Sequence, residues 1–142
     1  MRLLLDTPVL LYARGGEHPL RQPCQQLLQQ VSAGLFLPEC SVELVQEFAH
    51  VLLRRGVPPR TVARDARAVQ TACRVHSFDE VVLDAALDLV ARGGALGMRD
   101  AVHAATALVH GLDAVVTTDR AFAAVPRLKV LTPAQACDAL GA

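Results

Sequence analysis

The sequence predicts an α/β fold, a three-layer α/β/α sandwich built around a central parallel sheet. Short apolar runs such as Leu3–Leu5 alternate along the chain with longer segments of helical periodicity. These runs lack the polar alternation of a half-exposed strand, so they suit strands buried on both faces, as in a parallel sheet. Strand–helix alternation continues throughout, without an internal repeat or a linker, which favours one domain over residues 1–142.

The expected elements follow this alternation in order. Thr7 and Pro8 suit the N-cap and first position of the first helix, and Ser41 suits the N-cap of the third. Gly56 and Gly111 follow predicted helices, where a glycine commonly ends them. The predicted strands are residues 2–6, 35–38, 74–78, 114–118 and 128–131. The predicted helices are residues 8–14, 19–32, 41–55, 58–72, 79–92, 98–110 and 133–140.

Composition limits the class of protein. The chain is 52% hydrophobic with a mean hydropathy of +0.32, and only 4% aromatic without tryptophan, so Leu, Val and Ala must build the core. No uncharged run of about 18 residues exists, which excludes a membrane span. The first residues are too short and too soon acidic for a signal peptide, so we expect a cytoplasmic protein. The four cysteines form no C-x-x-C pair and are expected to be reduced thiols.

Charge is balanced overall but unevenly distributed. The chain has 14 basic and 14 acidic residues. Between Val51 and Arg74, however, six arginines face one acid, Asp65. This basic segment could contact the phosphates of a nucleic acid, meet a protein partner, or be a solvated pair of helices.

Three aspartates are expected near one edge of the sheet. Asp6 and Asp119 end two predicted strands, and functional groups in open α/β sheets gather beyond the carboxyl ends of strands. Asp100 lies in the first turn of the helix 98–110, close to the same edge. Each also has a simpler interpretation: Asp6 as a turn residue, Asp119 as an N-cap, and Asp100 as a favourable charge at a helix N-terminus. His103, one turn along, is more commonly a buried, hydrogen-bonded histidine than a base.

Two glutamates are candidates for a fourth acid. Glu43 and Glu47 are four residues apart and therefore share a helix face with His50. A solvated acidic stripe explains this spacing equally well. Taken together, however, three or four converging carboxylates would repel one another unless a cation neutralised them. Mg²⁺ or Mn²⁺, which prefer oxygen ligands, would do so and would also activate water for attack on a phosphodiester.

Several stretches in order resemble the PIN-domain family, and more narrowly its VapC-type toxins. They are "LLLDT", "SVELVQEFAHVLLRRG", "MRDAVHAATALVHGLDAVVTTDRAF" and "VPRLKVLTP". The resemblance implies a sheet of about five parallel strands and Mg²⁺- or Mn²⁺-dependent endoribonuclease activity. It also implies a small cognate antitoxin that covers the acidic cleft, and a homodimer.

The same resemblance assigns roles to individual residues. Asp6, Asp100 and Asp119 would hold the metal, and Glu47 would bind it or orient the attacking water, with Glu43 as its competitor.

Chemistry alone gives a second group of candidates. Thr7 and Thr118 could hydrogen-bond the acids or substrate phosphate, and Arg99 and Arg120, which flank two of the acids, could touch phosphate or be ordinary surface arginines. His103 belongs to this second group as a buried histidine.

Two other functions remain open at this point. The chain could be a non-catalytic PIN-like module that acts through its surface. A metal-dependent phosphatase or receiver-like domain also has acids at its strand ends. That class normally has a second acid close to the first, and Thr7-Pro8-Val9 offers none.

Overall fold

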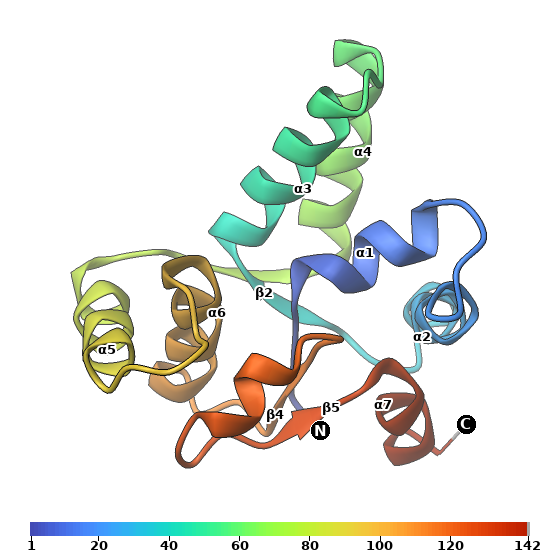
Figure 1. The fold of residues 1–142 in the computed structure, drawn as a ribbon. Coiled ribbons are helices and arrows are strands. Elements are labelled where there is room, and N and C mark those ends of the chain that lie inside the picture. The colour runs from blue at the N-terminus through green and yellow to red at the C-terminus, as the bar shows by residue number, and fades with distance from the viewer. Residues whose placement is uncertain (142) are drawn as a thin grey trace.

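The computed structural model describes residues 1–141 and confirms the predicted α/β/α class. In this part of the chain five parallel strands form one sheet in the order β3-β2-β1-β4-β5, with helices on both faces (Figure 1). The strands are β1 (Leu3–Leu5), β2 (Glu39–Ser41), β3 (Arg74–His76), β4 (Ala114–Val116) and β5 (Val130–Leu131). The helices are α1 (Thr7–Arg14), α2 (Arg21–Ser32), α3 (Val42–Arg54), α4 (Pro59–Ala72), α5 (Glu80–Ala91), α6 (Met98–Val109) and α7 (Pro133–Ala139), with the short 3₁₀ helix η1 (Arg120–Ala124) before β5.

The central strand β1 shows how the layers form. Side chains of a strand alternate between the two faces of the sheet. Leu3 and Leu5 pack into the apolar cluster that includes α1–α4 and α7, whereas Leu4 packs with α5 and α6 on the other face. All three leucines are buried, so the uninterrupted apolar run fits a strand covered on both sides.

Strand order places the ends of β1 and β4 at the switch point of the sheet. From β1 the chain proceeds to β2 and β3 on one side, and then returns to β4 on the other side of β1. Leu5 of β1 pairs with Val116 of β4, so the residues that follow these two strands leave the sheet side by side. Crevices at such points are where open α/β sheets bind ligands.

The expected strand at residues 35–38 is wrong, because β2 begins only at Glu39. Leu35 and Leu37 are 65% and 60% exposed, and the Leu35 N–H donates to Gln30 at the end of α2 instead of joining the sheet. Arg2 and His76 bond to the Glu39 carboxylate at 2.7–2.9 Å, which allows it to be buried in the sheet.

Helix positions follow the prediction within one or two residues, and one cap is different. The N-cap of α1 is Asp6 and not Thr7, since the Asp6 carboxylate accepts from the Thr7 N–H at 3.0 Å. Ser41 caps α3 as expected.

Helices α3 and α4 lie side by side and project from the body as an arm (Figure 1). Gly56, with φ of 81°, adopts the left-handed conformation that the turn between them requires. Leu52, Val62 and Ala66 are buried in the apolar cluster shared with β1. None of the helices within residues 1–141 is both long enough and apolar enough to cross a membrane.

Candidate active site

Asp6 is a buried carboxylate at the end of β1. Its side chain is almost fully enclosed, although the chain gives it no Arg or Lys partner among the described residues. Oδ1 accepts from the Thr7 N–H at 3.0 Å, and Oδ2 accepts from the Thr117 hydroxyl at 2.7 Å. Burial raises the pKa of Asp6 above its ordinary value, in spite of these bonds and of the nearby His103.

Thr117 connects Asp6 to Asp119, a supporting role that the sequence interpretation gave to Thr118 and not to Thr117. Its hydroxyl donates to Asp6 and accepts from the Asp119 N–H at 3.0 Å. Thr118, the predicted threonine, makes no side-chain hydrogen bond within residues 1–141. Strand alternation could have distinguished them, because Thr117 lies two residues after Val115 and so continues the face that α6 covers.

The structure brings Glu47, and not Glu43, to the end of β1. The Thr7 hydroxyl donates to Glu47 Oε2 at 2.9 Å, and His103 Nε2 lies 3.4 Å from the same oxygen. His103, the Thr7 hydroxyl and, more weakly, Arg99 keep the pKa of Glu47 below its ordinary value, although burial opposes them. Glu43 lies one turn earlier on α3 and does not contact these groups.

His103 occupies the centre of this arrangement. Its ring is buried on α6, with Nε2 facing both Glu47 and Asp6 Oδ1, the latter at 3.9 Å. Nδ1 is also buried and finds no hydrogen-bond partner in the described chain. The ring therefore separates two carboxylates from the apolar layer behind them and presents one nitrogen to both.

Asp100 and Asp119 complete the acidic group from two further elements. Asp100 lies half-buried in the first turn of α6, and Asp119 lies exposed where it caps η1 by accepting from the Ala121 N–H at 2.9 Å. Burial, the charges of Asp6 and Asp119, and a hydrogen bond with Asp119 raise the pKa of Asp100 to about 6. The four acids thus come from four segments of the sequence and influence one another at one edge of the sheet.

The acids lie close together, but their side chains are not oriented as the ligands of a complete metal-binding site. Within residues 1–141, no three His, Cys, Asp or Glu side chains lie close enough together to hold a metal ion as they are oriented. Their oxygen donors are of the type that hard divalent cations prefer. Arg99, 77% exposed, lies at the rim with Nη1 3.7 Å from Glu47 Oε1.

Comparisons with known proteins agree with this architecture. The PIN domain family model matches residues 3–128. Ribonuclease VapC7 of Mycobacterium tuberculosis is 36% identical over 122 residues, which cover 85% of this chain and 84% of that protein. Ribonuclease VapC13 of the same organism is 27% identical over 91% of this chain and 98% of its own.

Solved structures support the fold. The DNA-bound VapBC of Salmonella typhimurium has a TM-score of 0.73 at 16% identity, covering 94% of this chain and 98% of its own. VapC20 of Mycobacterium tuberculosis, a toxin that cleaves the sarcin–ricin loop, has a TM-score of 0.70 at 17% identity, with coverages of 86% and 93%. The chain therefore belongs to the PIN-domain family, and within that family to its VapC-type members.

Proposed function

We propose that this protein is the endoribonuclease toxin of a toxin–antitoxin pair, and that it hydrolyses RNA phosphodiester bonds with Mg²⁺ or Mn²⁺. The observation that carries the proposal is the group of Asp6, Asp100 and Asp119 beside Glu47, in which two carboxyls have raised pKa values. Acids with perturbed pKa values that meet in a crevice are typical of functional sites. The names of the two Mycobacterium tuberculosis relatives support ribonuclease activity.

A divalent cation fits the chemistry of this donor set. Mutual repulsion and burial favour protonated Asp6 and Asp100, and a cation would remove that penalty by pairing with the charges. Asp119 is exposed, so its side chain can rotate towards Asp6 and Asp100 to complete a set of oxygen ligands. When bound, the cation would polarise the phosphate and lower the pKa of a coordinated water.

Glu47 is suited to accept a proton from the attacking water. The hydrogen bonds from Thr7 and the neighbouring His103 ring favour its ionised form at neutral pH. They also fix the direction of the carboxylate, because both groups engage Oε2 and leave Oε1 towards Arg99. Thr117 holds Asp6 in place from the opposite side.

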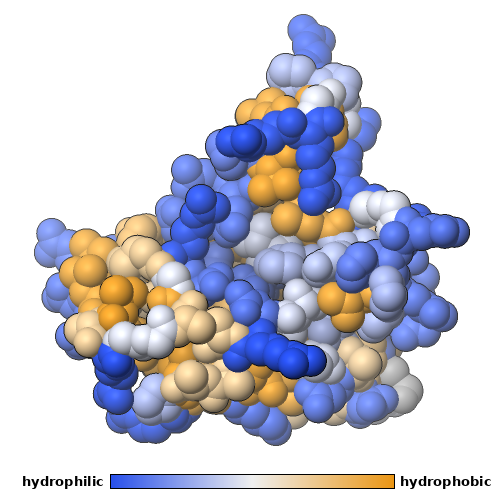
Figure 2. Space-filling model, in the orientation of Figure 1, coloured by the Kyte–Doolittle hydropathy of each residue, from blue (hydrophilic) through white to orange (hydrophobic). Residues whose placement is uncertain are grey.

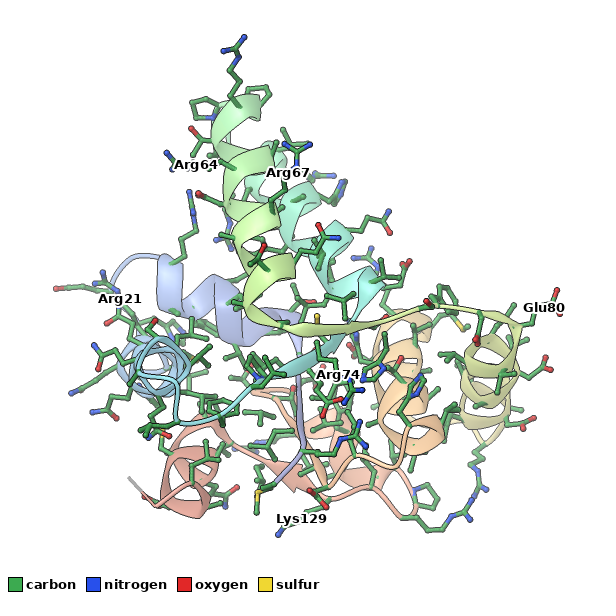
Figure 3. All side chains as sticks on the ribbon, turned by 180° about the vertical axis from the view of Figure 1, so that it is seen from behind. Arg21, Arg64, Arg67, Arg74, Glu80 and Lys129 are labelled. Carbon is green, nitrogen blue, oxygen red and sulfur yellow. The ribbon has the colours of Figure 1, made fainter. Side chains whose placement is uncertain are left out.

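Positive charge for the RNA backbone is available at two places. Arg99 stands exposed at the rim of the acidic group. A larger set lies on the arm, where Figure 3 shows Arg64 and Arg67 on α4. The exposed arginines of α3, α4 and the turn between them are Arg54, Arg55, Arg60, Arg64 and Arg67. Their contacts would be with phosphates, so they would contribute affinity but little sequence specificity.

The proposed partners are a small antitoxin and a second copy of the chain. Solved VapBC structures contain both components of such a pair, which supports an antitoxin here. Apolar side chains stand exposed along α5, and Figure 2 shows apolar surface on that side of the molecule. They are Val81, Leu83, Leu87 and Val90, and they would suit a dimer contact. We expect the pair to act in the cytoplasm.

The test is RNA cleavage by purified protein after EDTA treatment and return of Mg²⁺ or Mn²⁺. Asp6→Asn and Asp100→Asn should each lower the cleavage rate by roughly 100-fold or more, since removal of one preorganised charge-stabilising group costs about that much. Asp88→Asn on the exposed face of α5 should cleave like the wild type. Unchanged cleavage by Asp100→Asn, or equal cleavage in EDTA, would contradict the proposal.

A second candidate is the non-catalytic PIN-like binding module. This function is favoured because, in the described residues, no three His, Cys, Asp or Glu side chains are placed to hold a metal ion together. Calorimetric titration with Mn²⁺ separates the two functions, because a catalytic protein should bind the ion more tightly than its Asp6→Asn variant does. A binding module should show no difference between them.

A further inference from the structure

A cavity of about 360 Å³ opens next to the acidic group, in the angle between the base of the α3–α4 arm and α6 (Figure 1). Its apolar side is made by Phe78, Met98 and Val102. Glu43 and Gln46 of α3 supply polar atoms on the opposite side, and Glu47 lies in both the cavity and the acidic group. The volume falls within the range of ~300–1,000 Å³ that is usual for ligand pockets.

We propose that this cavity holds one unpaired nucleobase of the RNA substrate, next to the phosphate that is cleaved. This inference rests on the proposed ribonuclease function and names the part of the substrate that the site recognises. Because Glu47 belongs to both places, a base in the cavity belongs to the nucleotide adjoining the reacting phosphate. An unstacked base that leaves the strand is the usual target of specific RNA recognition.

The chemistry of the walls selects a base over other parts of RNA. Glu43 and Glu47 place two carboxylates in the cavity, and these repel a phosphate. Arg99 also lines the cavity, but it already lies 3.7 Å from Glu47 Oε1 and so offsets only one of the two charges. A neutral base meets no such repulsion. Phe78 and Met98 are 36% and 38% exposed, so a stacked base would remove apolar surface from water. Phe78 lies in the connection between β3 and α5, where its ring can serve as a stacking surface.

The polar side favours a base with an exocyclic amino group. A carboxylate accepts hydrogen bonds and cannot donate them, so Glu43 pairs with an amino group and repels a carbonyl oxygen. Cytosine and adenine present an amino group where uracil presents a carbonyl. Gln46 can bond to either kind of group and therefore adds affinity without this discrimination. We expect cytosine to be preferred over uracil at this position.

The experiment uses short single-stranded RNAs whose cleavage site has been mapped with the wild-type protein. In separate oligonucleotides, the base on either side of the cleaved bond is removed to leave an abasic nucleotide, or is exchanged between cytosine and uracil. One abasic position should lower kcat/KM by roughly ten- to a hundredfold, the usual range for the loss of one stacked base. The Phe78→Ala substitution should lower kcat/KM on intact RNA by a similar factor. The variant protein should then cleave intact and abasic RNA with the same kcat/KM.

Controls separate the role of the cavity from folding and from the acids. Leu37→Ala removes a 60% exposed apolar side chain between α2 and β2, outside the cavity, and should retain the wild-type preference. Glu43→Gln should reduce the preference for cytosine over uracil while cleavage continues. Circular dichroism melting of each variant shows whether it is folded.

Different outcomes identify which proposal fails. The base pocket is refuted, while the ribonuclease stands, if the wild type cleaves intact RNA and both abasic RNAs at the same rate. It is also refuted if Phe78→Ala lowers kcat/KM by the same factor on intact and on abasic RNA. If no RNA is cleaved, the ribonuclease fails, and fluorescence anisotropy in EDTA still tests the pocket by comparing Kd for intact and abasic RNA. If Phe78→Ala leaves RNA cleavage unchanged but abolishes inhibition by the cognate antitoxin, the cavity binds a peptide and the proposal is overturned.

Discussion

Asp100→Asn should stabilise the metal-free protein at neutral pH. The folded state holds the pKa of Asp100 at about 6, against an ordinary value of 3.8, so above pH 6 an ionised Asp100 is destabilising. At about 1.4 kcal/mol per pH unit the full penalty is roughly 3 kcal/mol. Solvent screening of a half-buried carboxyl reduces it, so we expect a gain of ~1–2 kcal/mol from asparagine.

The direction of the pH dependence makes this prediction specific. Between pH 3.8 and about 6 the folded protein binds more protons at Asp100 than the unfolded chain, so wild-type stability falls as pH rises through that window. The Asp100→Asn variant does not lose stability in this pH window, because asparagine does not titrate. Its advantage should therefore be small near pH 4 and complete above about pH 7.

Urea unfolding with EDTA present, followed by far-UV circular dichroism at pH 4.5 and pH 7.5, measures both parts of the prediction. Asp88→Asn is the matched control, since it neutralises an exposed carboxylate on α5 and should change little. An Asp100→Asn protein that is no more stable than the wild type at pH 7.5 would refute the reasoning. So would an advantage of equal size at both pH values.

Two further substitutions test the supporting residues. Thr117→Val keeps the shape of the side chain but removes the hydroxyl that donates to Asp6, so it should cost ~1–3 kcal/mol of stability and slow RNA cleavage; Thr118→Val should do neither. Equal cleavage by the two valine variants would contradict a role for Thr117. Glu39→Gln should lower Tm at pH 7, because it weakens the ion pair with Arg2. The pKa of Glu39 lies below its ordinary value of 4.5, so its stabilisation is fully present above that pH and is lost as the pH falls through the lowered pKa. In thermal melts, wild type and variant should therefore differ in Tm at pH 7 and approach each other at pH 3.

Fold class and the parallel direction of the strands could be predicted because they depend on patterns that the sequence displays directly. Apolar runs without polar alternation indicated a doubly covered sheet, and the regular strand–helix order implied parallel strands. These patterns did not predict the position of β2. Glu39 is a poor strand residue by composition, and its burial depends on Arg2 and His76, which are 37 residues away on either side. No local pattern reveals such a partner.

Some residues of the candidate site could likewise be predicted from sequence patterns, and others could not. Asp6 and Asp119 were found because strand ends meet at one edge of a parallel sheet, whatever the intervening sequence. The helical period placed Glu43 and Glu47 on one face but could not say which of them turns towards β1. That depends on the Thr7 hydroxyl and the His103 ring, which meet Glu47 from other elements of the fold. The cavity could not be predicted for a related reason: Phe78 lies in the connection between β3 and α5 and Met98 begins α6, and only the fold brings both to the same cavity as α3.

Glu39 and Asp6 show how the fold treats a buried acid in two opposite ways. Both carboxylates are buried: Glu39 lies on β2, and Asp6 directly follows the neighbouring strand β1. Burial raises the pKa of Glu39, but the bonds from Arg2 and His76 outweigh it, and the result lies below the ordinary value. Asp6 receives hydrogen bonds from two threonine groups and no arginine, so burial prevails and its pKa rises.

Glu39 shows that this fold can place cationic partners beside a buried carboxylate. Asp6 has no such arginine or lysine partner in the described chain, and Asp100 and Asp119 at the same edge of the sheet increase the electrostatic repulsion. A cost of this kind in the free protein is expected where an external cation supplies the missing charge. Mg²⁺ or Mn²⁺ should therefore raise the Tm of the wild type but leave that of Asp6→Asn nearly unchanged, and an equal rise in both would contradict a cation site at Asp6.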